Sequence, residues 1–211
     1  SYSHVFNNDA LQLKYNSTSA YYSLMDSKIV NFFFDMNIPL QSRQRIPNLD
    51  SRAQLEAVSG VKYFTTDSER PEFVPYGFYK IDEQTIGNKK YELYQNKNFL
   101  PLGFTYSSFI KADEYESLPT EKKQQAMLQG VVLNDSIGGY ETTSLSFDDI
   151  TANCSMEYNH DEIVMENNRI FVKKPKAKIT VVFEPNRDNE CYLKFTNLSF
   201  IRPIQSAEFK Q

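Results

Sequence analysis

The sequence predicts an α+β fold, with a mixed α/β portion over residues 1–135 packed on an antiparallel β-sandwich-like portion over residues 136–211. Apolar residues recur at helical spacing only in the first portion, whereas strict alternation of apolar and polar residues dominates the second. No stretch rich in Pro, Gly or Ser separates the two portions, so we expect them to form one packed body.

The first portion is predicted to begin with a strand and to continue into a helix. Alternation over residues 11–15 predicts a strand that ends in a turn at Asn16-Ser17. An apolar face at steps of three and four then predicts a helix, and this face consists of Tyr22, Met25, Ile29, Phe33 and Met36. Thr18 or Ser19 would cap the start of this helix, and Pro39 would follow its end.

A second helix, a glycine and a strand follow in immediate succession. Ser51-x-x-Gln54 resembles a capping box, which predicts a short helix over residues 52–59. Gly60 stands where a left-handed residue would end that helix. The run of residues 61–64 after it predicts a strand, so the three parts form a compact αβ unit.

Short strands and one more helix complete the first portion. The sequence predicts strands over residues 78–81, 90–95 and 104–109, with a tight turn at Gly87-Asn88 between the first two. Pro119 early in a first turn predicts a helix, which Gly130 would end. The second portion is predicted to contain only strands, because its apolar and polar residues alternate with a period of two.

The strands of the second portion are separated by turns every ten or so residues, as is typical of a β-sandwich. Residues 163–165 and 170–172 flank Asn167-Asn168, which predicts a hairpin. Alternation over residues 179–183 and 191–195 predicts two further strands.

Composition excludes several classes of protein. The net charge is −4 and no Lys/Arg-rich stripe stands out, so we expect no nucleic-acid partner. No apolar run approaches the roughly 18–20 residues that span a bilayer. The chain begins at Ser1 without a leader sequence, so we expect a processed protein or a fragment of a longer one.

The chemistry-bearing residues form no recognisable constellation. His4 and His160 are the only histidines, and no zinc-ligand spacing, calcium loop, phosphate-binding loop or nucleophile motif occurs. We therefore predict no metal site, no cofactor and no catalytic residue in this chain. Cys154 and Cys191 lie in separate β segments, where facing strands would bring them within reach of a disulfide. The alternative is two separate buried thiols.

Tyrosines and amides that flank the mixed α/β segments suggest sugar recognition, because rings stack on pyranose faces and amides bond to hydroxyls. The candidate ligand-binding residues are Asn16, Tyr21, Tyr22, Tyr94, Asn96 and Asn98. The alternative is that these tyrosines are core residues with satisfied hydroxyls.

Several stretches in one order resemble the large extracytoplasmic region of YfhO-like bacterial membrane proteins. The specific elements are Gly60-Val61-Lys62-Tyr63 and, later, Asn98-Phe99-Leu100-Pro101-Leu102-Gly103-Phe104. They are accompanied by Tyr15–Leu24, Val30–Phe33 and Pro75–Phe78, so the resemblance covers about residues 10–130. The second portion resembles the family only diffusely. A Gly-Trp pair expected near the end of that region is missing, since the chain contains no Trp.

The resemblance implies a polytopic parent of the GT-C glycosyltransferase type at the cell membrane. Such proteins are linked to sugar decoration of lipoteichoic acid or related wall polymers in Gram-positive bacteria, from a lipid-phosphate-linked donor. Their acid–base residues are expected in transmembrane loops, so none is carried over to this chain. The expected partners are the parent transmembrane domain and a wall polymer or glycan.

Three hypotheses follow for the chain itself. The first is an extracytoplasmic accessory domain that positions an acceptor polymer or braces the catalytic part. The alternative is a free-standing secreted carbohydrate-binding module. The third is a hydrolase with paired carboxylates, which requires a deep cleft and one acid of raised pKa.

Overall fold

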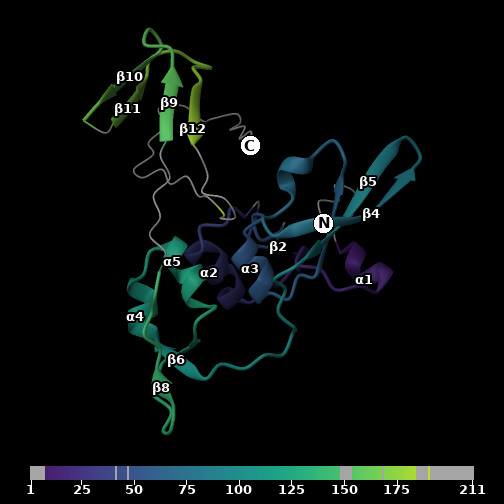
Figure 1. The fold of residues 1–211 in the computed structure, drawn as a ribbon, viewed down its shortest axis with the longest axis vertical. Helices are drawn as coiled ribbons and strands as arrows, with labels where there is room; N and C mark the ends of the chain where they lie inside the picture. Colours follow the sequence, from purple (N-terminus) through teal and green to yellow (C-terminus); the bar gives the residue numbers. More distant parts are fainter. Residues whose placement is uncertain are drawn as a thin grey trace. The chain divides into compact units, whose positions relative to one another are not determined.

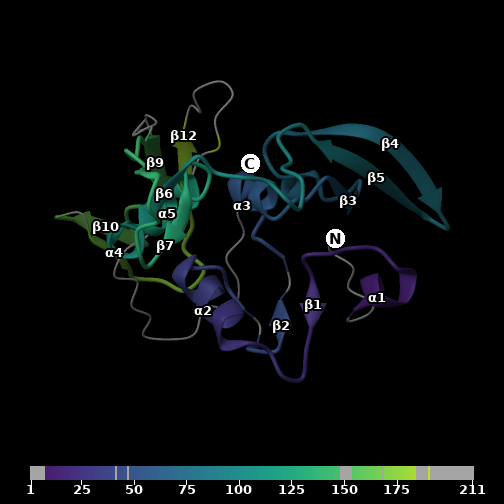
Figure 2. The ribbon, with the colours of Figure 1, turned by 90° about the horizontal axis from the view of Figure 1, so that it is seen from below.

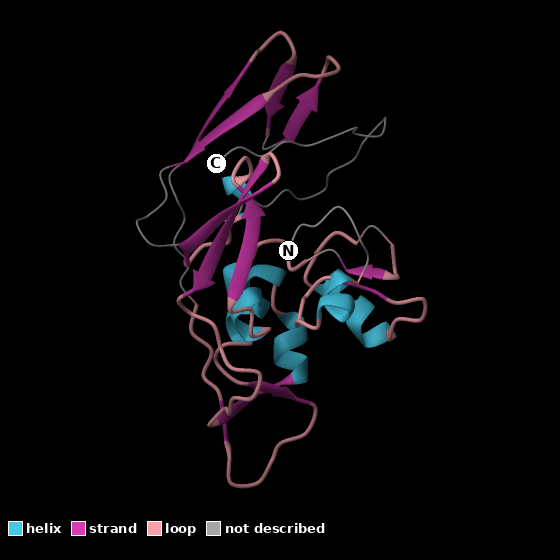
Figure 3. Ribbon diagram, turned by 90° about the vertical axis from the view of Figure 1, so that its right-hand side faces the viewer, coloured by secondary structure: helices cyan, strands magenta, loops and turns pink. Residues whose placement is uncertain are grey.

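The computed structural model describes residues 8–40, 42–46, 48–147, 154–167, 169–183 and 190. Short helices and mostly antiparallel sheets confirm the predicted α+β class (Figure 1). The chain divides into two compact units, the first over residues 1–147 and the second over residues 148–205. The helices of the described chain, coloured cyan in Figure 3, all belong to the first unit: α1 (Asp9–Leu13), α2 (Ser27–Asp35), α3 (Ala53–Val58), η1 (Pro71–Phe73), α4 (Ala112–Ser117) and α5 (Thr120–Ala126).

The prediction of a strand over residues 11–15 is wrong, because α1 occupies this stretch. Asn8 and Lys14 are both in the left-handed conformation and bound the single helical turn. Leu11 and Leu13 are both exposed, so their alternation does not reflect a buried strand face. Spacing alone cannot distinguish such a pair from a strand when neither residue reaches a core.

The predicted first helix is confirmed as α2, but its predicted start is wrong. The side chain of Asp26 accepts a hydrogen bond from the backbone N–H of Lys28 at 2.8 Å, and this cap replaces Thr18 or Ser19. The residues ahead of Asp26 instead form β1 (Ala20–Tyr21), which pairs with β2 (Arg45–Ile46).

The helix predicted over residues 52–59 is confirmed as α3, and Gly60 after it has a φ of 69°, as the turn requires. The predicted capping box is wrong, because Arg52 precedes the helix and supplies no side-chain cap. The Ser51 hydroxyl instead donates to the Phe73 carbonyl at 2.9 Å, so it ties α3 to η1.

The core of the first unit collects around α2 and α3. Its buried members come from both helices and from the segment between them, which includes β2: Phe33, Met36, Ile38, Ile46, Leu49 and Leu55. Phe32, Tyr115 and other half-buried side chains pack against this cluster from outside. The amphipathic spacing of α2 therefore has the role that the sequence predicts.

An antiparallel three-stranded sheet follows α3, and its strands β3, β4 and β5 are labelled in Figure 2. Its order is β3 (Tyr63–Asp67), β5 (Lys89–Asn96), β4 (Phe78–Ile86), with the predicted turn at Gly87-Asn88 between β4 and β5. A β-bulge interrupts the β4–β5 register, because Lys80 pairs with Tyr94 and Asp82 already pairs with Leu93.

A second three-stranded sheet is parallel, which the sequence analysis did not predict. The strand β6 (Ser108–Lys111) lies between β7 (Val131–Leu133) and β8 (Glu141–Thr142) and is parallel to both. The helices α4 and α5 make the crossover from β6 to β7. The predicted strand over residues 104–109 is therefore largely wrong, since β6 begins only at Ser108.

The second unit contains β9 (Cys154–Tyr158), β10 (Ile163–Glu166), β11 (Arg169–Val172) and β12 (Ile179–Phe183). β9 pairs antiparallel with β12, and β10 pairs antiparallel with β11. The hairpin predicted at Asn167 is confirmed, and Asn167 has a φ of 51°. The strand predicted over residues 191–195 lies outside the described residues.

Candidate functional site

Asn96 and Asn98, two of the predicted ligand-binding residues, lie together at the end of β5. Asn96 is only 2% exposed. Its amide nitrogen donates to the Val61 carbonyl at 3.0 Å, and its amide oxygen accepts from the Asn98 backbone N–H at 2.9 Å. Asn98 is exposed and its amide lies against Gly77. The amide of Asn96 thus fastens β5 to the start of the sheet.

Tyr94 lies on the same face of β5 as Asn96, two residues earlier. Its hydroxyl donates to a Glu92 carboxylate oxygen at 2.7 Å, and burial followed by this hydrogen bond raises the pKa of Tyr94. Phe64 and Phe78 flank this end of the face, with ring centroids 6.0 Å apart in an edge-to-face arrangement. Tyr94 is therefore committed to contacts within the sheet.

Tyr21, Tyr22 and Asn16 belong to a different part of the first unit. The Tyr21 backbone N–H and carbonyl both bond to the side-chain amide of Asn8, each at 2.7 Å. The amide therefore satisfies the Tyr21 backbone as a neighbouring strand would. The Tyr22 backbone N–H donates to the Gln44 carbonyl at 3.0 Å. The rings of both tyrosines and the side chain of Asn16 are exposed.

The opposite face of the β3–β5–β4 sheet carries aromatic residues that the sequence analysis did not select. Alternation and register place Tyr63 of β3, Gln95 of β5 and Tyr79 of β4 in one cross-strand row. Two rows further on, Tyr91 of β5 lies beside Gln84 of β4. We call this surface the tyrosine face and define it by Tyr63, Tyr79, Tyr91, Gln84 and Gln95.

The three rings of the tyrosine face are open to solvent. Tyr63 is 51% exposed, Tyr79 48% and Tyr91 38%. None of their hydroxyls has a hydrogen-bond partner among the residues that the structure describes. The Lys62 ammonium lies 5.2 Å from the Tyr63 ring centroid. Such rings, joined by amide side chains, can stack on a flat apolar surface while the amides bond to polar groups around it.

Alternation along β5 could have identified this face. The positions of Tyr91 and Gln95 differ from those of Tyr94 and Asn96 by odd numbers. Because side chains alternate along a strand, the two pairs must point to opposite sides of β5. Tyr94 and Asn96 were predicted as ligand-binding residues from their residue types. Which side is exposed depends on the packing of the sheet, which residue types alone do not define.

The two sequence elements that carry the family resemblance contact each other. A side-chain carbon placed on Gly60 would lie 3.3 Å from the Leu100 carbonyl and 3.4 Å from the Leu102 side chain. The Leu100 backbone N–H donates to the Ala57 carbonyl at 3.2 Å. The Lys62 ammonium also lies 5.2 Å from the Phe99 ring. The two segments therefore form one structural joint between α3 and the sheet.

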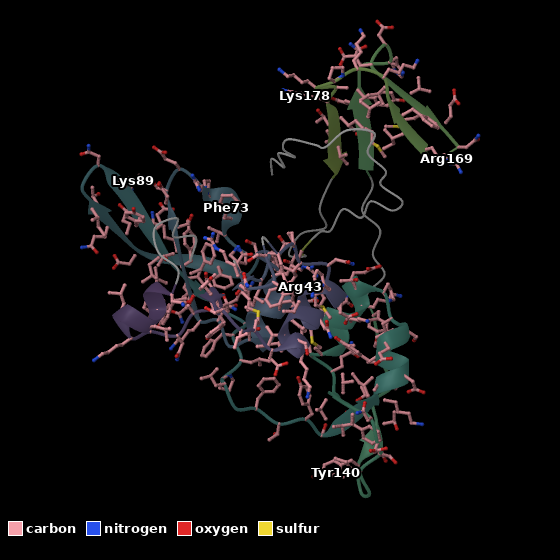
Figure 4. The ribbon with its side chains drawn as sticks, turned by 180° about the vertical axis from the view of Figure 1, so that it is seen from behind. Arg43, Phe73, Lys89, Tyr140, Arg169 and Lys178 are labelled. Atoms are coloured by element: carbon pink, nitrogen blue, oxygen red, sulfur yellow. The ribbon has the colours of Figure 1, made fainter. Side chains whose placement is uncertain are left out.

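Acidic and basic side chains form a network at the β4–β5 hairpin, whose tip carries Lys89 (Figure 4). The Lys80 ammonium lies 2.5 Å from a carboxylate oxygen of Glu83 and 2.7 Å from one of Glu92. Lys90 adds a contact of 2.8 Å to Glu83. Hydrogen bonds from Lys80 and then Lys90 lower the pKa of Glu83 to about 2.

The described residues contain no candidate metal site, and the predicted disulfide falls partly outside them. Across residues 8–183, apart from the gaps given above, no group of three His, Cys, Asp or Glu side chains is placed to hold a metal ion. Cys154 begins β9, and Cys191 lies outside the described residues, so the bridge between them stays a prediction. The helices of the described part are all too short or too polar to cross a membrane.

Comparison with known proteins assigns a family to this arrangement. The family model described as "Bacterial membrane protein YfhO" matches residues 2–209. The chain is also 33% identical over 142 residues to the "Uncharacterized protein YfhO" of Bacillus subtilis (strain 168). That alignment covers 66% of this chain and 16% of the relative, so the chain spans a small part of the relative's length. No solved structure matches the chain.

Proposed function

The chain belongs to the YfhO family of bacterial membrane proteins, and we propose that it is an extracytoplasmic part of a membrane glycosyltransferase. The proposed reaction transfers a sugar from a lipid-phosphate-linked donor to lipoteichoic acid or a related wall polymer. The catalytic groups would lie in the transmembrane part of the parent. The resemblance of the Gly60–Tyr63 and Asn98–Phe104 elements supports this assignment.

The tyrosine face is the observation that favours acceptor positioning over a purely bracing role. Tyr63 and Tyr79 flank Gln95 in one row, so two exposed rings border a group that can both donate and accept hydrogen bonds. A sugar ring presents an apolar face and an equatorial rim of hydroxyls, which match rings and amides respectively. A bracing surface would not require unpartnered phenol hydroxyls.

Charge indicates which part of the polymer this face would hold. The chain has a net charge of −4. The tyrosine face adds Asp82 beside Leu93 and Asp67 beside Tyr91, of which Asp67 pairs with Lys89 at 3.4 Å. Lys62 and Lys89 offset these two carboxylates, so the face offers no excess of positive charge to a polyanionic phosphate backbone. We therefore propose that the face holds sugar units and not the phosphodiester chain.

The test uses the full-length protein in the bacterium that encodes it. We expect the Tyr63→Ala/Tyr79→Ala double variant to reduce the sugar content of the wall polymer about tenfold, because two stacking rings are lost. The measurement is the ratio of sugar to phosphate in purified polymer. The matched control is Tyr15→Ala/Tyr140→Ala, which removes two exposed rings away from the face (Tyr140 is labelled in Figure 4).

Two results would contradict different parts of the proposal. Deletion of the gene without any change in polymer glycosylation would reject the glycosyltransferase assignment. Normal glycosylation by the Tyr63→Ala/Tyr79→Ala variant, at wild-type protein level, would reject acceptor positioning by the tyrosine face and leave bracing as the role of this part.

A further inference from the structure

A second candidate site is a polar pocket of about 450 Å³ between α2, α4, α5 and the end of β7. It is distinct from the tyrosine face, which belongs to the β3–β5–β4 sheet. Pockets of roughly 300–1,000 Å³ hold small molecules, so this volume suits one or two sugar rings. Figure 1 shows α2, α4 and α5 gathered in the first unit.

The spacing of residues along two helices builds the pocket. α2 presents Asn31, Phe32 and Asp35, which fall on one helical face. α4 contributes Tyr115 to the lining. Phe32 and Tyr115 also pack against the core cluster, so the aromatic walls of the pocket are held by the fold. A site with walls fixed in this way needs little rearrangement to bind.

The lining of the pocket includes a buried lysine with a carboxylate partner. Lys123 is 7% exposed, its ammonium is bonded to one carboxylate oxygen of Asp35, and it lies 5.4 Å from the Tyr115 ring centroid. The second carboxylate oxygen of Asp35 and the Tyr115 hydroxyl have no hydrogen-bond partner among the described residues. Burial and the nearby Asp35 raise the pKa of Tyr115 to about 12, so the phenol stays a neutral donor.

Charge balance defines the class of ligand. Lys28 and Lys123 supply two positive charges, and Asp35 and Glu116 supply two negative ones. A phosphate or a carboxylate would meet as many like charges as opposite charges, so neither anions nor cations are favoured. The pocket instead offers a free carboxylate oxygen, a phenol and the amides of Asn31 and Asn134 to uncharged hydroxyls.

We propose that this polar pocket binds one uncharged pyranose, with Asp35 and Tyr115 bonded to its hydroxyls and Phe32 against its apolar face. The inference goes beyond the proposed function, because it concerns a separate site and does not require that the parent transfers sugar. A single pyranose buries little surface, so we expect a Kd of about 1 mM.

The experiment is a titration of the 211-residue chain, labelled with nitrogen-15, with glucose and N-acetylglucosamine up to about 50 mM. We expect saturable shifts of the side-chain amide signals of Asn31 and Asn134. Sorbitol, an acyclic polyol with the same kind of hydroxyls, should produce no saturable shift. The tyrosine-face amides of Gln84 and Gln95 report on the other site in the same spectra.

The decisive variant is Tyr115→Phe, which removes the phenol hydroxyl and keeps the ring packed on the core. We expect it to weaken binding about fivefold, as the loss of one hydrogen bond to a ligand does. Tyr140→Phe is the matched control, because it removes a phenol hydroxyl from an exposed ring outside both sites and should leave this binding unaltered. Asp35→Asn should weaken binding at least as much as Tyr115→Phe.

The proposal is overturned if neither sugar shifts the Asn31 and Asn134 signals, or if sorbitol shifts them equally. Equal affinity of Tyr115→Phe and the unaltered chain would also reject it. Each result is independent of polymer glycosylation in the bacterium, so failure of this site and failure of the proposed function are separable.

Discussion

Arg52 is a buried cation that joins three segments of the first unit. It is 8% exposed, and its guanidinium donates to the Met36 carbonyl at the end of α2 and to the Gln124 side-chain oxygen of α5 at 3.3 Å. Its Nε lies 3.7 Å from a carboxylate oxygen of Asp50. Burial raises the pKa of Asp50, and the Arg52 charge partly opposes that rise.

We predict that Arg52→Met destabilises the chain by about 3 kcal/mol, because two buried acceptors lose their donor. Urea unfolding followed by circular dichroism measures this loss. The control is Arg43→Met, since Arg43 is exposed and labelled in Figure 4, and we expect a change within about 0.5 kcal/mol. Equal unfolding midpoints for the two variants would refute the role assigned to Arg52.

The sequence could not indicate this role for Arg52. Its neighbours in space, Met36 and Gln124, are 16 and 72 residues away along the chain. A local pattern such as Ser51-x-x-Gln54 is visible in the sequence, yet Ser51 bonds to Phe73 instead. Local residue types therefore revealed where a helix lies, whereas the partners of its polar side chains depend on the tertiary fold.

The β4–β5 hairpin is the element whose stability depends most clearly on pH. The pKa of Glu83 is lowered from 4.5 to about 2, first by the hydrogen bond from Lys80 and then by that from Lys90. A lowered carboxyl pKa stabilises the folded state above the unfolded-state pKa. That contribution is present above about pH 4.5 and is lost as the pH falls toward 2.

We predict that Glu83→Gln lowers the thermal midpoint at pH 7 and that the difference from the unaltered chain closes as the pH approaches about 2. The effect is small, because the network is exposed. Thermal melts between these pH values, repeated at high salt, measure it. The control is Glu69→Gln, at an exposed site outside the network, and it should change the thermal midpoint at pH 7 less than Glu83→Gln does.

Glycine-marked turns were predicted correctly, whereas strand pairings set by distant contacts were not. Gly60 marked the end of α3, and Gly87-Asn88 marked the hairpin between β4 and β5. The parallel pairing of β6 with β7 and β8 has no local signature, since it joins short segments across a helical crossover. The exposed side of the β5 strand was missed for the same reason.

At the scale of the whole molecule, the described strands pair only with strands of the same unit. Every strand pairing among the described residues stays within residues 1–147 or within residues 148–205. The core cluster around Phe33 and Leu55 also belongs entirely to the first unit. The first unit thus contains the packing that a separately stable domain requires.

We predict that a fragment of residues 1–147 folds alone, because every described member of the core cluster and of the first unit's sheets lies within it. Its nitrogen-15 spectrum should overlay the corresponding signals of the full chain. A fragment of residues 1–135, which ends at the boundary that the sequence suggests, should be less stable, since it lacks β8 and Thr143. The Thr143 hydroxyl donates to the Ser108 hydroxyl at 2.8 Å. An unfolded 1–147 fragment would contradict this prediction.

The β-bulge in β4 affects which insertions and deletions the strand can accept. Ile81 has no partner on β5, so side-chain parity reverses there: Tyr79 shares a face with Asp82 and Gln84, and Glu83 shares one with Lys80. Loss of that single codon would restore strict alternation and leave every other side chain on its present face, because Lys80 and Asp82 already pair with the consecutive residues Tyr94 and Leu93. Lineages should therefore tolerate deletion of Ile81 far better than deletion of a paired residue of β4, which would shift the register of the strand.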